Sequence, residues 1–177
     1  MGVVRIQNEA LTSEMILAMD EIAERDWRNG SDREKRMLEG TMAATLLEKW
    51  FGRMERRVLE IERRTEGWFF TKEDGSRATF AYFDPTFKDL VISVKEQHPN
   101  VILAVADVEN FSLWRSPRRG AITTATIEQV DVPTMELIAR WRSKERAKGA
   151  EAGLSMRQVY TDLRLTVGAM LRFSKAL

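Results

Sequence analysis

The stretch SDREKRMLEGTMAATLLEKWFGRMERRVLEIERRTE, residues 31–66, decides the fold expected for this chain because it is continuous and contains no proline. Ser31 and Glu34 have the spacing of a capping box, which marks the start of a helix. Gly67 stands where the end of a helix is expected. The stretch therefore predicts a single long helix over residues 31–66.

The predicted helix is longer than the domain that carries it. At ~1.5 Å per residue it would span about 52 Å. A compact domain of 177 residues is only about 40 Å across. The helix must therefore bend, protrude, or pack against something outside its own domain.

Apolar residues in this stretch recur every seven positions in two interleaved rows, as in a coiled-coil seam. Up to Trp50 the apolar face is wide, as in a buried helix, and beyond it the seam is narrow and flanked by charges. We expect the second half to be an arm that pairs with another helix. The residues predicted for this oligomer interface are Leu47, Phe51, Met54, Val58 and Ile61. The alternative is a helix that bends at Gly52 and buries the seam in its own domain.

The rest of the chain predicts further helices and about five mostly antiparallel strands. Helices are expected over 13–28, from 85 to 97, and as a C-terminal pair within 133–177. The Asp74-Gly75 dipeptide between aromatic runs predicts a hairpin over 68–83, and strands are expected over 101–108, 111–114 and 121–130. The order is α-α-β-β-α-β-β-β-α-α. We expect one α+β domain over 1–177, with the arm at 31–66 and the sheet region at 68–130.

Composition limits the chemistry. The chain has no cysteine, which excludes disulfides, thiolate metal sites and a cysteine nucleophile. No apolar run is long enough for a membrane span, and no signal peptide is visible, so we expect a cytoplasmic protein. The common nucleotide-binding loops are absent, and no small-molecule cofactor is expected.

Charge is distributed unevenly although the net charge is only +1. Residues 1–110 carry 16 Lys/Arg against 21 Asp/Glu, and residues 111–177 carry 12 against 6. The basic part has arginines beside tryptophans, a combination that holds phosphates and stacks on bases. The predicted binding residues for nucleic acid or an acidic partner are Trp114, Arg115, Arg118, Arg119, Arg140, Trp141 and Arg142. The alternative is a solvated basic turn followed by an ordinary charged helix end.

The sequence also contains candidate residues for two other kinds of site. His98, the only histidine, precedes Pro99 in a turn, where a structural or surface role is expected. Asp84, Asp107 and Glu109 follow predicted strands, and carboxylates at strand ends can hold a divalent cation. The lysine that a nuclease-like site also needs does not follow them, and Asp84 is as well explained as a helix cap.

These observations favour binding over catalysis. We expect an assembly protein that oligomerises, or docks to another helical protein, through its long helix. Its Arg-rich turn is expected to contact nucleic acid or an acidic protein surface. The alternatives are a divalent-metal-dependent enzyme that processes nucleic acid, and a pure protein–protein scaffold.

Overall fold

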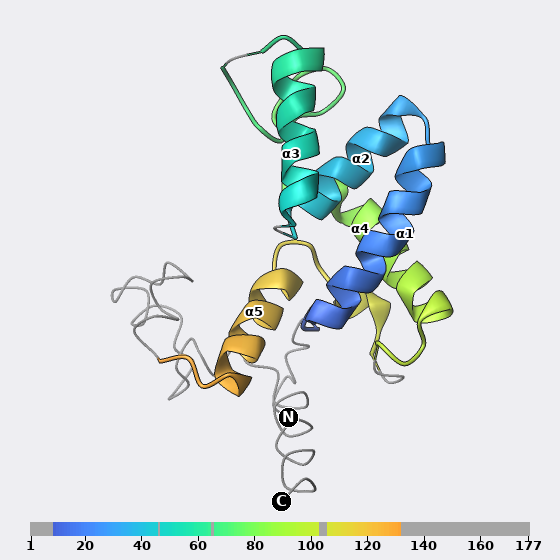
Figure 1. Cartoon of the computed structure of the whole chain (residues 1–177), viewed down its shortest axis with the longest axis vertical. Coiled ribbons are helices and arrows are strands. Elements are labelled where there is room, and N and C mark those ends of the chain that lie inside the picture. Colours follow the sequence, from blue (N-terminus) through green and yellow to red (C-terminus); the bar gives the residue numbers. More distant parts are fainter. Residues whose placement is uncertain (1–8, 46, 65, 103–105, 132–177) are drawn as a thin grey trace, which may run out of the picture. The chain divides into compact units, whose positions relative to one another are not determined.

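The computed structural model describes residues 9–45, 47–64, 66–102 and 106–131. Every regular element in these ranges is helical (Figure 1). The elements are α1 (Ser13–Asn29), α2 (Asp32–Ala43), α3 (Glu48–Arg56), the π-helical turn η1 (Arg57–Ile61), α4 (Phe80–Gln97), the 3₁₀ turn η2 (Val108–Asn110) and α5 (Ser116–Ile127). The predicted C-terminal helical pair lies outside the described residues.

The chain forms two compact units. One comprises Ser13–Trp114 and contains α1 to α4; we call it the helical unit. The described residues of the other are 9–12 and 115–131, which include α5; we call it the α5 unit. Within the described ranges, none of the helices combines the length and apolar character needed to cross a membrane.

The predicted α+β fold is wrong for the described residues, because they form no strand. Where the hairpin was expected, only an isolated antiparallel bridge joins Thr71 and Arg77. The turn itself is present: Gly75 has a φ of +79° and donates its N–H to the Lys72 carbonyl at 3.1 Å. Residues 80–83 of the second predicted strand are instead the start of α4. Its apolar residues continue the helical spacing of the later turns, with Phe83, Phe87, Leu90, Val91 and Val94 buried on one face.

The three later strands are also wrong wherever the structure describes their residues. Residues 103–105 of the first lie outside the described ranges, and the residues after them form a loop and η2. Residues 111–112 continue that loop, and Leu113 and Trp114 lie in a turn. Most of 121–130 belongs to α5, which has Pro117 in its first turn, a position that favours helix initiation. Thr126 fits into this helix because its hydroxyl donates a hydrogen bond to the Ile122 carbonyl, one turn earlier, at 2.8 Å.

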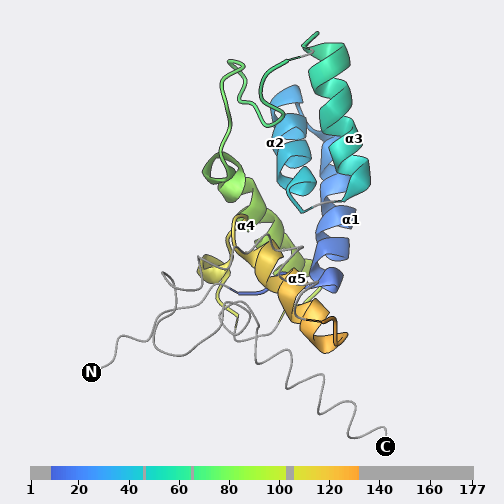
Figure 2. The ribbon, with the colours of Figure 1, turned by 90° about the vertical axis from the view of Figure 1, so that its left-hand side faces the viewer.

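The prediction of a single long helix is wrong as well, because the helix is interrupted between the end of α2 at Ala43 and the start of α3 at Glu48. The capping box at its start is confirmed, with Ser31 and Glu34 bonded reciprocally. At the break, the Thr45 N–H and hydroxyl both donate to the Met42 carbonyl, at 3.0 and 2.7 Å. That carbonyl is the acceptor that the next helical N–H would have used. Leu47 is then extended, α3 begins, and it packs beside α2 (Figures 1 and 2).

Burial explains why the chain folds back. Trp50 on α3 is fully buried, and so are Met19 on α1, Met42 on α2 and Phe87 on α4. Gly40 allows α2 to approach α4 closely: a Cβ at this position would lie 2.2 Å from the ring of Phe83. The four helices therefore share one core, and α3 is part of it.

The α5 unit is built on an equally close backbone contact. The Leu11 N–H donates to the Ser116 carbonyl at 3.0 Å. One turn further along α5, a Cβ on Gly120 would lie 1.8 Å from the Leu11 carbonyl oxygen. Glycine is required there because the segment at 9–12 lies directly on the helix.

Candidate functional site: an aromatic groove on the helical unit

The predicted oligomer interface does not form one exposed seam. Met54 is 2% exposed and belongs to the core, while Leu47 and Val58 are half-buried. Phe51 and Ile61 are exposed, by 45% and 66%. Only the exposed members of the set are available to a partner.

A chain of ring contacts connects Phe51 to Trp114. The Phe51 ring stacks on Phe69 with centroids 4.4 Å apart and an interplanar angle of 20°. Phe69 meets Phe70 edge-on at 5.2 Å, Phe70 lies 6.1 Å from Phe80, and Phe80 lies 5.0 Å from Trp114. The rings come from α3, the loop before α4, the start of α4 and the end of the helical unit. Offset and edge-on pairs of this kind add stability beyond the area they bury.

Part of this chain lines a groove of about 300 Å³. Trp68 and Trp114 lie on it and are 54% and 55% exposed. We call it the aromatic groove; its lining is Trp68, Phe69, Phe70, Arg77, Ala78, Thr79, Phe80, Phe83 and Trp114. The lining contains one cation and no carboxylate.

Polar contacts hold the loop that carries the first rings. The Arg64 guanidinium donates to the Thr71 hydroxyl at 3.0 Å and to the Gly75 carbonyl at 3.2 Å. The Ala78 N–H donates to the Phe70 carbonyl at 2.9 Å. These bonds close the loop on itself and fix the aromatic side chains between them.

Further contacts hold the two tryptophans. The Arg77 guanidinium lies 4.5 Å from the centroid of the Trp68 ring, within range of a cation–π interaction. The Leu113 N–H donates to the Asp84 carboxylate on α4 at 2.8 Å, which anchors the residue before Trp114. Both exposed rings are thus attached to fixed parts of the helical unit.

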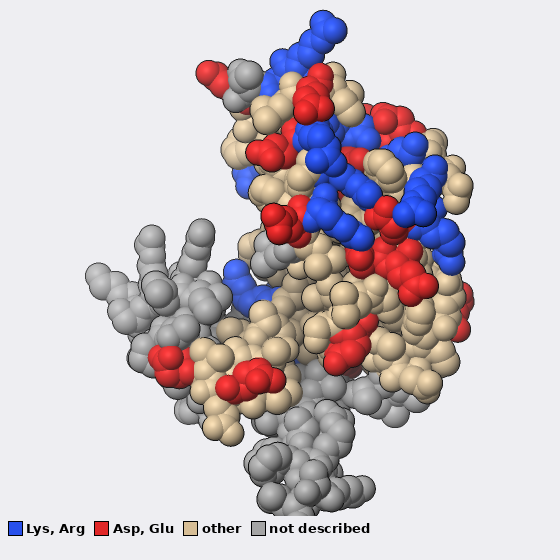
Figure 3. Space-filling view, in the orientation of Figure 1, with Lys and Arg blue, Asp and Glu red and all other residues tan. Residues whose placement is uncertain are grey.

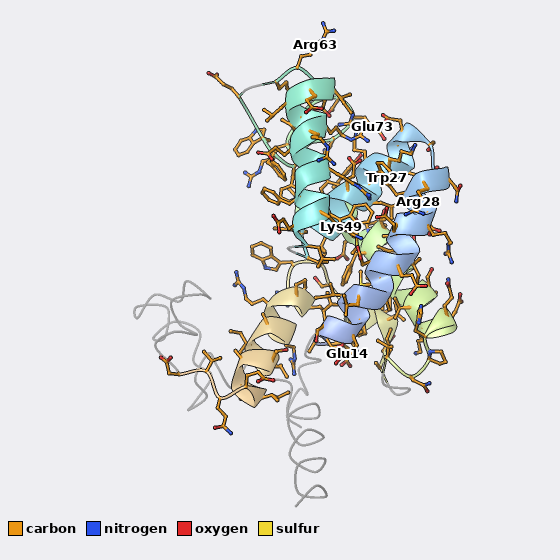
Figure 4. All side chains as sticks on the ribbon, viewed as in Figure 1. Glu14, Trp27, Arg28, Lys49, Arg63 and Glu73 are labelled. Atoms are coloured by element: carbon orange, nitrogen blue, oxygen red, sulfur yellow. The ribbon has the colours of Figure 1, made fainter. Side chains whose placement is uncertain are left out.

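The charged face over α1 and α3 is different in kind, because its charges are paired. Lys/Arg and Asp/Glu alternate there (Figure 3). The Arg53 guanidinium donates two hydrogen bonds to the two carboxylate oxygens of Glu24, at 2.9 and 2.8 Å. The same guanidinium lies 4.1 Å from the centroid of the Trp27 ring. The hydrogen bond from Arg53 lowers the pKa of Glu24 to about 2, and Lys49 adds to the effect. Figure 4 labels Trp27 and Lys49 on this face. The ion pair between Arg53 and Glu24 joins α3 to α1, and charges that are paired in this way are not available to a ligand.

The predicted basic site is divided by the structure. Trp114 lines the aromatic groove, whereas Arg115 is the N-cap residue of α5 and Arg118 and Arg119 lie in its first turn. Arg115 and Arg118 are exposed, and Arg119 is only 7% exposed. The remaining members, Arg140, Trp141 and Arg142, lie outside the described residues.

The three carboxylates of the metal alternative have structural roles. Asp84 accepts the Leu113 N–H, and Asp107 caps η2 by accepting the Glu109 N–H at 3.0 Å. Glu109 pairs with Lys88 at 2.6 Å, and this bond raises the pKa of Lys88. In the part of the chain that the structure describes, no three His, Cys, Asp or Glu residues are grouped to hold a metal ion.

The sequence interpretation missed most of the groove. Its signal was present as a high density of aromatic residues over 68–70 and 80–83. The predicted strands would place neighbouring rings on opposite faces of a sheet and so separate them. Comparisons with protein-family profiles, with curated proteins and with solved structures show no match to this chain.

Proposed function

We propose that this chain is a non-catalytic assembly protein that self-associates through the aromatic groove of its helical unit. The observation that supports this is the clustering of exposed rings on and beside the groove, namely Phe51, Trp68 and Trp114. Large exposed apolar patches mark interaction surfaces. Tryptophan is also among the residues that contribute most to binding at protein interfaces. The groove replaces the interrupted helix as the expected contact.

The charge of the helical unit favours a protein over nucleic acid at this surface. Residues 13–114 carry 15 Lys/Arg against 20 Asp/Glu, a net charge of −5. Phosphate backbones bind where positive charge is concentrated. A protein partner that brings apolar side chains to the groove and a net positive charge to this acidic unit fits better.

Light scattering of the purified full chain tests this proposal. We expect a mass above that of one chain, 20.4 kDa, which falls to the monomer value in a Phe51→Ala/Trp68→Ala variant. Leu17→Ala is the matched control because Leu17 is 64% exposed on α1 and does not line the groove. A monomeric wild type at every concentration, or dissociation by the control as well, would overturn the proposal.

A second function is proposed for the start of α5, where the N-cap residue Arg115 and Arg118 of the first turn are exposed. Outside residues 13–114 the chain carries 13 Lys/Arg against 7 Asp/Glu, a net charge of +6. We propose that this part contacts nucleic acid or an acidic protein surface. Binding of a labelled oligonucleotide should weaken with salt and in Arg118→Ala, but not in Arg33→Ala on the acidic helical unit. Equal loss in both variants, or no binding at low salt, would contradict it.

A further inference from the structure

We infer that the aromatic groove of one copy binds the C-terminal segment, residues 154–177, of a second copy. This inference rests on the proposed self-association and identifies its second surface. The groove offers aromatic walls and one guanidinium, within a unit of net charge −5. Its occupant should therefore present apolar side chains to the groove, and a net positive charge on that occupant complements the acidic unit as a whole.

The C-terminal segment has that chemistry. Its sequence is LSMRQVYTDLRLTVGAMLRFSKAL, and it carries four Lys/Arg against one Asp/Glu. Apolar residues recur at steps of three and four, which is the pattern by which an amphipathic helix binds in a groove. These residues are Met156, Val159, Tyr160, Leu163, Val167, Met170 and Leu171. A volume of about 300 Å³ is at the small end of pockets that take small molecules, and it suits a few side chains from such a helix.

Charge also argues against the simplest alternative, in which the grooves of two copies face each other. That symmetric contact would bring together two units of net charge −5, each with a guanidinium in its groove, and like charges disfavour association. A contact between the acidic unit of one copy and a basic segment of the next joins opposite charges. Such a contact uses two different surfaces and is heterologous.

The chain is long enough for the segment to reach another copy. Residues 132–153 separate the last described residue from Leu154. At ~3.3 Å per extended residue these 22 positions span up to about 70 Å. This reach exceeds the expected size of the helical unit, so the contact between copies meets no geometric limit.

The absence of cysteine makes a cross-linking test direct. Thr79 is exposed, lines the groove and makes no side-chain capping bond at the start of α4, which makes it a suitable site. Full chains carrying Thr79→Cys are mixed with full chains of different tag mass carrying Thr166→Cys, and are then oxidised. We expect a mixed disulfide dimer. It should be absent when Trp68→Ala is added, or when Leu17→Cys replaces Thr79→Cys.

A second readout uses the C-terminal segment itself. Leu163→Asp should lower the mass in light scattering as the groove variant does. Gln158→Asp, which changes the charge equally at a position outside the apolar set, should leave the mass unchanged. A chain carrying both cysteines should form the dimer, whereas a fast-migrating cross-linked monomer alone would show docking within one chain and overturn the inference.

The failure of this inference differs from the failure of the proposed function. If groove variants dissociate the oligomer while Leu163→Asp does not and no mixed dimer forms, self-association through the groove stands with another occupant. If the wild-type chain is monomeric, both are overturned.

Discussion

The Arg57 guanidinium donates from Nε and Nη2 to the two carboxylate oxygens of Glu39, at 2.5 and 3.2 Å. Both side chains are almost completely buried. Trp27 donates its indole N–H to the same carboxylate at 2.8 Å, and Arg57 also pairs with Asp32. The bond to Glu39 raises the pKa of Arg57, so its charge is permanent. This pair fastens the turn after α3 to α2 and explains why residues 48–61 are not a free arm.

We expect Arg57→Met to destabilise the helical unit by about 3–5 kcal/mol, because it leaves the Glu39 carboxylate buried without its cation. The double variant Arg57→Met/Glu39→Gln should cost less than the sum of the two single variants. Urea unfolding of the four chains gives this coupling. Arg33→Met, which removes an exposed pair with Glu73, should cost at most ~1 kcal/mol. Equal costs for Arg57→Met and Arg33→Met would contradict the assigned role.

Stability should fall on acidification because of Glu24. Its pKa is lowered from 4.5 to about 2 by the hydrogen bond from Arg53. A depressed folded-state pKa contributes stability that is present above pH 4.5 and is lost as the pH falls through 4.5 towards 2. Carboxyl NMR titration should show the low value in the wild type and a rise towards 4.5 in Arg53→Met. Arg28→Met is the control, since its contact with Glu24 is exposed and longer, at 3.5 Å. A normal pKa for Glu24 in the folded wild type would refute the prediction.

Two glycines in neighbouring helices should respond oppositely to alanine. Gly40→Ala would place a methyl carbon 2.2 Å from the buried ring of Phe83, a clash that should cost about 1–3 kcal/mol. Gly52→Ala meets only the end of the Arg56 side chain at 3.8 Å. It should stabilise α3 by about 0.5–1 kcal/mol, because alanine loses less backbone entropy in a helix. Thermal unfolding of both variants compares them, and a stabilising Gly40→Ala would show that α2 and α4 are less closely packed.

Asp84→Ala should loosen the wall of the groove that carries Trp114. It removes the acceptor of the Leu113 N–H, a bond to a charged group worth about 1.5–3 kcal/mol. Hydrogen exchange at the Leu113 amide should accelerate by at least tenfold, which corresponds to ~1.4 kcal/mol. Asp84→Asn retains an acceptor oxygen, so the Leu113 amide should exchange more slowly in this variant than in Asp84→Ala. Unchanged exchange in Asp84→Ala would show that this bond does not hold the loop.

The sequence-based predictions that are confirmed are those that depend on a pattern of a few neighbouring residues. The helix over 13–28 is present as α1, the Ser31–Glu34 capping box starts α2, and the turn at Asp74-Gly75 forms. Each depends on local backbone geometry that a short sequence pattern specifies. The aromatic groove could not be found in this way, because it combines residues of the loop at 66–79, α4 and Trp114. Ring contacts between positions so far apart in sequence exist only after the helices have packed.

The sequence by itself determined where α1 and α2 begin, where the turn at 74–75 falls, and how charge divides along the chain. Only the tertiary structure decided that residues 80–83 and 121–127 are helical, because short apolar runs fit a strand or a buried helix equally well until a partner surface selects one face. It also decided the break at 44–47. Burial of Trp50 and pairing of Arg57 with Glu39 stabilise a folded-back α3, and a continuous helix would have left both side chains without these partners.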